Sequence, residues 1–367
     1  MKTKKGKVIF ADQLRVVAFI SVVFVHWFSS YFDSPGAISY ITNINAESSS
    51  NPNVYSNLLP PLTHFNYGPF GVAIFFLISG FVIPFSLYTK SVKGFIESRF
   101  LRIFPTYIAC AVISMLVSFI ISHYVFGENY NHDIKQILLN LSLTHSIFSI
   151  LSIDAVNWTL AIEIKFYLIS ALIYKSIRNG RVYGIYIFCI LSSMFLLLTY
   201  NKDLSFTFAT VLFDPKQLSQ EFIFISYMFI GTIFNMHFRK ALSKKEASVS
   251  VILMITFVIL MWRLGHFSEQ VPSTSLNYIY ALVIFTVCYL MRDRFVYYPA
   301  IAFLSAISFP FYALHSIIGF TIIRLFDVKF GCYWAGLIAA LIITFGFSVL
   351  IHYTIERWSI NLGKKRN

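Results

Sequence analysis

The chain has 367 residues, of which 57% are hydrophobic and only 12% are charged, and its formal net charge is +13. A soluble domain carries about 25% charged residues, so the composition excludes an ordinary soluble protein and indicates an integral membrane protein. The basic residues form short clusters between apolar runs, which argues against nucleic-acid binding and is typical of membrane topology.

Ten apolar segments are long enough to span a bilayer as helices. They predict an all-α integral membrane protein, a bundle of ten transmembrane helices in a single domain covering residues 1–367, with no appended domain outside the membrane. The segments cover about 8–30, 68–89, 101–122, 156–177, 182–200, 220–238, 248–264, 275–291, 301–323 and 333–355.

Clusters of Lys and Arg precede the first segment and follow every even-numbered segment. All the clusters therefore fall on one side of the membrane, and the positive-inside rule makes that side cytoplasmic. We expect both termini in the cytoplasm and the loops 31–67 and 123–155 outside. The second loop contains an amphipathic stretch, Ile134–Ile150, which is too polar to span and should lie at the outer surface.

The four cysteines, Cys110, Cys189, Cys288 and Cys332, lie within or at the ends of apolar runs, and none belongs to a Cys-x-x-Cys pair. We therefore expect neither a disulfide framework nor a metal site. The first apolar run is long and lacks a small-residue cleavage site, which argues against a cleavable signal peptide.

The first segment places two ionisable side chains, Arg15 and His26, where lipid is expected. They lie ~16 Å apart along a helix axis, and eleven steps of ~100° bring them to nearly the same face. A charged group in the bilayer core costs at least ~2.5 kcal/mol, so such groups usually face a protein interior and serve a function. The alternative is an arginine that snorkels to the cytoplasmic surface and a histidine in the interface.

Two further titratable residues, Glu163 and His315, share the outer half of the membrane with His26 in this topology. A polar site at that depth is one interpretation, and hydrogen-bonded packing residues are the other. Arg99 and Arg102 stand at the cytoplasmic side, and side chains at i and i+3 face the same way and can grip phosphate. Plain positive-inside anchoring also accounts for this pair, as an interfacial aromatic belt accounts for Trp158.

Together these motifs resemble acyltransferase family 3, the ten-helix membrane acyltransferases that modify cell-surface glycans. The first motif is the Arg-x10-His pattern of Arg15 and His26. The others follow in order: GVAIFFLISGFVIP (71–84), RFLRIFP (99–105), NWTLAIEIKFYL (157–168), FYALH (311–315) and TIERW (354–358). The chain departs from the family at Ala73 and Ile164, where acids are common, and at Trp358, where proline is common.

The resemblance implies transfer of an acyl group, acetyl by family frequency, from cytoplasmic acetyl-CoA or another acyl-CoA to a sugar hydroxyl outside the cytoplasm. The acceptor would be a polysaccharide or its lipid-linked precursor, such as lipopolysaccharide O-antigen, capsule or exopolysaccharide, or a small secondary metabolite. The implied location is the bacterial plasma (inner) membrane, with acyl-CoA, the glycan and membrane lipids as partners and no nucleic acid. The sequence does not indicate an oligomeric state.

The resemblance also suggests roles for individual residues. His26 would deprotonate the sugar hydroxyl or take the acyl group first, since a neutral histidine with a pKa near ~6.5 suits general-base work. Glu163 would orient a histidine, tune its charge or bind the acceptor, and His315 is a second candidate base. The full set is His26, Glu163 and His315 for catalysis, Arg15, Arg99 and Arg102 for acyl-CoA, and Trp158 and Tyr167 for the acceptor.

Two other classes of function remain open from the sequence. A transporter or lipid flippase also places charged residues inside its helices. The chain shows neither repeated halves nor paired broken helices, which argues against a transporter, whereas residues at two depths on one helix would suit alternating access. A structural membrane protein would leave Arg15, Glu163 and His315 without a purpose.

Overall fold

The computed structural model describes residues 8–46, 54–201, 204–208, 211–265 and 268–365, and its secondary structure is almost entirely helical. Its α-helices from the N-terminus to the middle of the chain are α1 (Ile9–Val25), α2 (Tyr31–Asp33), α3 (Pro35–Thr42), α4 (Val54–Asn57), α5 (Tyr67–Val82), α6 (Pro84–Thr89), α7 (Val92–Ile120), α8 (Ile134–Leu141), α9 (Asn157–Leu172) and α10 (Tyr174–Arg178). The later ones are α11 (Tyr183–Asn201), α12 (Pro215–Phe238), α13 (Lys244–Leu264), α14 (Ser273–Leu290), α15 (Pro299–Leu314), α16 (Ile317–Phe330), α17 (Tyr333–Ile351) and α18 (Arg357–Lys365).

Other regular elements interrupt these helices. Two short strands, β1 (Phe206–Phe208) and β2 (Val211–Phe213), pair in antiparallel fashion between α11 and α12, and the apolar pattern did not predict them. Turns of π-helix occupy His26–Ser30, Ile121–Val125 and His352–Glu356, and 3-10 turns occupy Ser268–Gln270 and Arg292–Arg294.

All ten predicted segments are helical, and the prediction of an all-α membrane protein is confirmed. In the described part of the chain, eight helices are long and apolar enough to cross a membrane: Ile9–Asp33, Tyr67–Thr89, Val92–Val125, Tyr183–Tyr200, Pro215–Phe238, Lys244–Leu264, Ser273–Leu290 and Tyr333–Lys364.

The other two predicted segments depart from a plain span. Segment 301–323 is the pair α15 and α16, which are bent by 67° relative to each other and make a ninth span if counted together. Segment 156–177 breaks at Ile173 between α9 and α10. The 16-residue α9 is shorter than the eight spans and carries two charged residues, Glu163 and Lys165.

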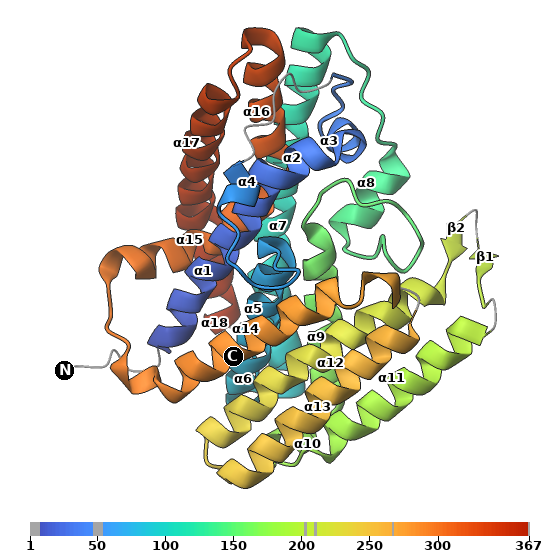
Figure 1. Cartoon of the computed structure of the whole chain (residues 1–367), viewed down its shortest axis with the longest axis vertical. Helices are drawn as coiled ribbons and strands as arrows, with labels where there is room; N and C mark the ends of the chain where they lie inside the picture. The colour runs from blue at the N-terminus through green and yellow to red at the C-terminus, as the bar shows by residue number, and fades with distance from the viewer. Residues whose placement is uncertain (1–7, 47–53, 202–203, 209–210, 266–267, 366–367) are drawn as a thin grey trace.

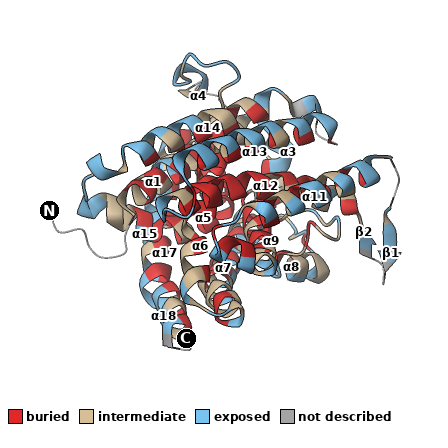
Figure 2. Ribbon diagram, turned by 90° about the horizontal axis from the view of Figure 1, so that it is seen from below, coloured by how far each residue is buried: buried red, intermediate tan, exposed pale blue. Residues whose placement is uncertain are grey.

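Helix α5 lies at the centre of the bundle (Figures 1 and 2). On one side α11, α12, α13 and α14 lie next to one another, and on the other side lie α7, α15, α16 and α17 (Figure 1). Glycines allow α5 to touch its neighbours: a Cβ at Gly71 would lie 2.7 Å from the Ala18 carbonyl oxygen, and one at Gly80 would clash with the Met228 carbonyl. Close backbone approach through small residues is how helices commonly pack in membranes.

The amphipathic stretch Ile134–Ile150 is helical only over its first eight residues, which form α8. After α8 the chain turns at Leu143, whose φ is +58°. The buried Asn140 side chain then organises the loop, because its amide oxygen accepts hydrogen bonds from the Asn157 amide (2.8 Å) and the Ile153 N–H (3.2 Å). These bonds tie residues 151–157 to α8, so a continued helix would lose them.

The predicted orientation can be tested with the native Cys332, which is exposed in the turn between α16 and α17. We expect Cys332 to react with an impermeant maleimide in intact cells, because the positive-inside rule places this turn outside. Cys332→Ser should abolish the labelling. Lys245→Cys, at an exposed position in the same background, should react only after permeabilisation. Labelling of Lys245→Cys alone in intact cells would reverse the topology.

Candidate active site

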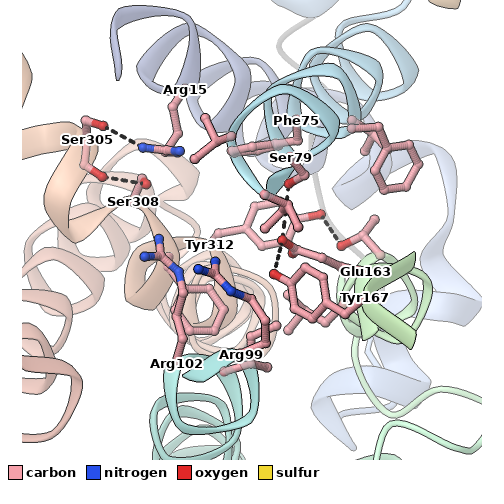
Figure 3. Close-up of a pocket in the computed structure, with 18 of the residues that line it drawn as sticks. Arg15, Phe75, Ser79, Arg99, Arg102, Glu163, Tyr167, Ser305, Ser308 and Tyr312 are labelled. Carbon is pink, nitrogen blue, oxygen red and sulfur yellow. Dashed lines mark hydrogen bonds between the residues drawn. The ribbon is translucent and has the colours of Figure 1, made fainter. Parts of the chain in front are cut away.

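A cavity of about 130 Å³ lies where α1, α5, α7, α9 and α15 meet (Figure 3). Hydroxyl groups contribute to its lining from Ser79, Thr159, Tyr167, Ser305, Ser308 and Tyr312. Its charged lining residues are Arg15, Arg99, Arg102, Glu163 and Glu356. Four of these five charged residues, Arg15, Arg99, Arg102 and Glu163, were singled out from the sequence. They come from three separate helices, α1, α7 and α9, and the fold brings them together.

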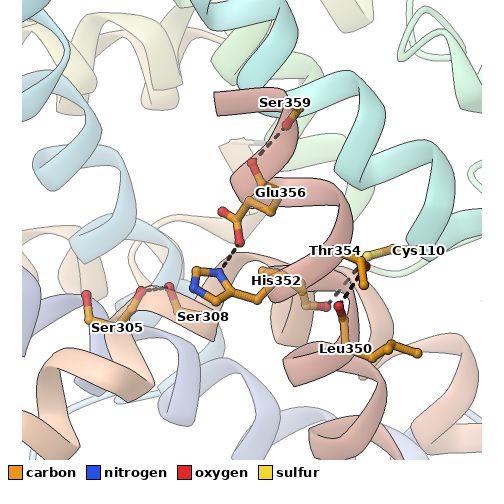
Figure 4. Close-up of polar contacts among 9 residues, drawn as sticks. Cys110, Ser305, Ser308, Leu350, His352, Thr354, Glu356 and Ser359 are labelled. Atoms are coloured by element: carbon orange, nitrogen blue, oxygen red, sulfur yellow. Dashed lines mark hydrogen bonds and ion pairs between the residues drawn. The ribbon is translucent and has the colours of Figure 1, made fainter. Parts of the chain in front are cut away.

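The two carboxylates of the cavity are held by neighbouring side chains. The Ser79 hydroxyl donates to Glu163 Oε1 at 3.1 Å, and the Tyr167 hydroxyl donates to the same oxygen (Figure 3). Glu356 pairs instead with His352, whose Nδ1 lies 2.6 Å from Glu356 Oε2 (Figure 4). Both partners of that pair lie in the π-helical turn His352–Glu356.

The arginines differ in how they are held. Arg15 donates to Asp12 Oδ1 at 3.1 Å and to Ser305 Oγ at 3.3 Å. The Arg99 guanidinium lies 5.9 Å from the centre of the Tyr167 ring. Its Nε is buried and has no hydrogen-bond partner among the described residues. A buried N–H of a cation without an acceptor is costly, so Arg99 is suited to receive an anionic group.

The two histidines form a pair outside this set of charges. His26 Nδ1 lies 3.0 Å from His315 Nε2, and the two rings stack with their centres 5.1 Å apart. His315 is fully buried. The sequence placed both histidines at one depth, and the structure places them in direct contact.

Both histidines lie where a helix is irregular. His26 begins the π-helical turn His26–Ser30, and His315 lies at the break between α15 and α16. The Trp27 indole N–H donates to the His315 carbonyl at 3.0 Å, which satisfies a backbone group released by the break. π-helical turns are frequent at functional sites.

Hydrogen bonding assigns a tautomer to each neutral ring. His315 Nδ1 lies 2.8 Å from the Tyr312 carbonyl, which only accepts, so Nδ1 carries the proton. His315 Nε2 is then an acceptor, and His26 Nδ1 must donate to it. His26 Nε2 is left with a lone pair and can accept a proton from a substrate.

The short segment that precedes α9 holds the turn at Ser316 through a hydrogen bond. The Ala155 N–H donates to Ser316 Oγ at 3.1 Å, and Asp154 lies beside it. Burial raises the pKa of the Asp154 carboxyl to about 6, although hydrogen bonds from Ser316 and from the Val156 and Ala155 amides act in the opposite direction.

Tyr312 connects the cavity to the histidine pair. Its side chain lines the cavity, and its ring centre lies 5.6 Å from that of His315. Its backbone carbonyl accepts a hydrogen bond from the His315 Nδ1–H. Among the described residues, the lining of the cavity includes neither histidine. Glu163 therefore lies with the arginines, not beside the histidines as one of its expected roles would require.

The two residues expected to bind an acceptor are separated. Tyr167 lies in the cavity, bonded to Glu163. Trp158 packs against Phe76 and Phe224 and donates its indole N–H to the Ala155 carbonyl at 3.2 Å. Among the described residues, Trp158 is therefore not part of the cavity lining but packs behind one lining residue, Phe76.

Several polar residues of the site had no role assigned from the sequence. Glu356 belongs to the motif at 354–358. It follows the last apolar run, where a charged residue is expected at the membrane interface, so the sequence alone does not indicate a role in the site. His352 lies four residues before it, the one signal for their pairing. In the described part of the chain, no group of three or more His, Cys, Asp or Glu residues could hold a metal ion.

Comparison with known proteins gives a family match over most of the chain. Residues 8–353 match the family model described as an acyltransferase domain. The chain is 25% identical over 222 residues to the O-acetyl transferase of Shigella phage Sf6, covering 58% of this chain and 63% of that protein. It is 30% identical over 115 residues to the acyltransferase MdmB of Streptomyces mycarofaciens, covering 30% of each. No solved structure matches the chain.

Proposed function

Because the chain belongs to the acyltransferase family whose model it matches over residues 8–353, we propose that it transfers an acetyl group from cytoplasmic acetyl-CoA to a sugar hydroxyl outside the cytoplasm. The resemblance drawn from the motifs is confirmed at the level of the family. The proposed acceptor is a polysaccharide or its lipid-linked precursor, and the proposed location is the bacterial inner membrane.

The arrangement of charge supports the donor side of this proposal. Three arginines meet in the cavity, and the Nε of Arg99 lacks an acceptor among the described residues. Glu163 is bonded to two hydroxyls and Glu356 to His352, so among the described residues no carboxylate is bonded to Arg99 or Arg102, and both guanidinium groups can bind an anion. Phosphate oxygens of acyl-CoA fit these guanidinium groups.

The observation that carries the proposal is the contact between this cavity and a histidine pair in which the Nε2 lone pair of His26 has no hydrogen-bond partner among the described residues. Arg99 and Arg102 would hold the phosphates, and Arg15 would line the path of the extended pantetheine arm. Tyr312 lines the cavity and its ring lies beside His315, so in this proposal the thioester approaches His26 past Tyr312. An acceptor hydroxyl would then enter from the outer side.

In the proposed reaction His26 Nε2 takes the proton of the acceptor hydroxyl as its oxygen bonds to the carbonyl carbon. The carbon–sulfur bond then breaks, and His26 returns the proton to the departing thiolate. His315 accepts the His26 Nδ1–H throughout and holds the ring in its orientation. Glu163 is proposed to hold Tyr167, whose ring lies beside Arg99, and Trp158 is proposed to hold the segment at Ala155 through its hydrogen bond to that carbonyl.

Purified protein in detergent should cleave the thioester of acetyl-CoA and, with an acceptor glycan present, transfer the label to it. A transporter or flippase, the alternative function, would do neither. Such a protein would instead move a glycan, lipid or small metabolite across reconstituted vesicles. Absence of thioester cleavage together with transport would replace the acyltransferase proposal.

The arginines provide a quantitative test of the donor site. Arg102→Ala should raise the KM for acetyl-CoA roughly 10- to 100-fold with a smaller change in kcat, because a charged hydrogen bond contributes about 1.5–3 kcal/mol to ground-state binding. Arg102→Lys should restore this only in part, since a point charge cannot replace the planar guanidinium.

Lys93→Ala is the matched control, because it removes a cation from the same helix α7 at an exposed position. Its KM should equal that of the wild type. An unchanged KM in Arg102→Ala at matched expression would assign Arg102 to membrane anchoring.

A further inference from the structure

Two hydroxyl groups, those of Thr159 and Tyr312, face each other in the cavity. Their oxygens lie 3.1 Å apart, and both side chains are buried. They come from α9, which also carries Glu163, and from α15, which ends one residue before His315. In Figure 3 the Tyr312 side chain reaches across the cavity toward the helix that carries Glu163.

The direction of this hydrogen bond follows from a third atom. Thr159 Oγ1 lies 2.8 Å from the Val156 carbonyl, which only accepts, so the single Thr159 proton is donated there. Tyr312 must therefore be the donor to Thr159. The phenol proton of Tyr312 is thus aimed within the cavity and held by a neutral acceptor.

The Tyr312 ring is fixed in place. It packs against the Phe75 ring at 5.3 Å between centres and against the His315 ring at 5.6 Å. Its own backbone carbonyl accepts a hydrogen bond from the His315 Nδ1–H. The Tyr312 hydroxyl is consequently held at a fixed position relative to the His26–His315 pair. Electrostatic stabilisation of a transition state requires such a fixed donor.

We propose that the Tyr312 hydroxyl is the hydrogen-bond donor that stabilises the oxyanion formed on the thioester carbonyl. This inference rests on the proposed acetyl transfer. When the acceptor oxygen bonds to the carbonyl carbon, the carbonyl π electrons move to its oxygen, and the acceptor proton moves to His26. Tyr312 turns its O–H from Thr159 to that oxygen and keeps its proton. Collapse re-forms the C=O bond and expels the thiolate, which takes the proton from His26.

The arginines are less suited to this task. Arg15 is held by Asp12 and Ser305, and Arg99 and Arg102 come from the end of α7 that the topology places on the cytoplasmic side. The thioester carbonyl must lie near His26 for the reaction. The Tyr312 ring packs on His315, the histidine that is bonded to His26. The Tyr312 hydroxyl is also a neutral donor, so it adds no charge next to the His26–His315 pair.

Tyr312→Phe tests the inference, because it removes one oxygen and keeps the ring between Phe75 and His315. We expect kcat for thioester cleavage of acetyl-CoA to fall about 10²–10³-fold, with KM within twofold of wild type. Tyr227→Phe is the matched control: Tyr227 is a fully buried tyrosine whose hydroxyl donates to the Tyr278 carbonyl at 2.8 Å. That variant should keep the wild-type kcat.

Thr159→Val distinguishes the role of the Thr159 hydroxyl from that of the Tyr312 hydroxyl. It removes the resting acceptor but leaves the Tyr312 donor, so kcat should stay within about tenfold of wild type, far above that of Tyr312→Phe. A larger loss in Thr159→Val than in Tyr312→Phe would make Thr159 the donor and overturn the inference. Thermal stability of each variant is recorded on the same samples.

The outcomes for the proposed function and for this inference are distinct. If wild-type protein does not cleave acetyl-CoA, the proposed function fails. If wild type cleaves acetyl-CoA and Tyr312→Phe does so at the same kcat, only the role of Tyr312 fails. A fall in both kcat and thermal stability, with equal loss in Tyr227→Phe, would reduce Tyr312 to a packing residue.

Discussion

Replacing His26 with glutamine is expected to lower acetyl transfer to about 1% of the wild-type rate or less, since general acid–base catalysis contributes ~10²–10⁴-fold. Glutamine keeps a donor and an acceptor and can still bond to His315 Nε2, but it has no group that takes a proton near neutral pH. The measurement is transfer from labelled acetyl-CoA by purified His26→Gln, with thermal stability determined on the same sample. His26→Ala should be equally inactive.

His237→Gln is the matched control. His237 is a part-buried histidine whose Nδ1 lies 2.7 Å from the Tyr289 hydroxyl, and it lies outside the cavity lining formed by the described residues. That variant should transfer normally. Near-normal turnover in His26→Gln would remove His26 from the chemistry. Label that stays on wild-type protein without an acceptor, and is absent from His26→Gln, would mean that His26 takes the acyl group first.

Helix geometry alone was enough to put Arg15 and His26 on one face, and the structure uses that face for both the cavity and the histidine pair. Depth along the membrane normal was also enough to bring His26 toward His315. Glu163 shows the limit of that reasoning. A sequence gives the depth of a residue in a span, but the direction in which the helix faces depends on tertiary packing.

The packing of α9 decides that direction. Lys165, two residues after Glu163, forms a buried ion pair with Glu221 of α12 at 2.7 Å. Residues two apart on a helix lie on opposite sides, so this pair turns Glu163 toward the arginines. The partner Glu221 is 56 positions later in the chain, and no local pattern connects the two residues.

The broken span and the π-helical turns were missed for a related reason. Residues 301–323 form one continuous apolar run, and Pro310 lies five residues before the break at His315. The break is supported by groups from elsewhere in the chain, the Trp27 indole and the Ala155 N–H. The site therefore depends on long-range hydrogen bonds that compensate for lost helical ones.

His315 provides the last test, because the tautomer argument makes it an acceptor that positions His26 and not a base. His315→Phe keeps an aromatic ring but removes the acceptor for His26 Nδ1–H, so transfer should fall about 10²-fold or more. His315→Gln offers an amide oxygen as acceptor and should retain transfer within about tenfold of wild type.

If His315→Gln were as inactive as His315→Phe while His26→Gln stayed active, His315 would be the base. The double variant His26→Gln/His315→Phe tests whether the two histidines act as one catalytic unit or contribute independently to the transfer rate. If His315 acts only through His26, the double variant should be no slower than His26→Gln alone, since residues that act as one unit are not additive. A further large loss in the double variant would mean that His315 contacts the reacting groups itself.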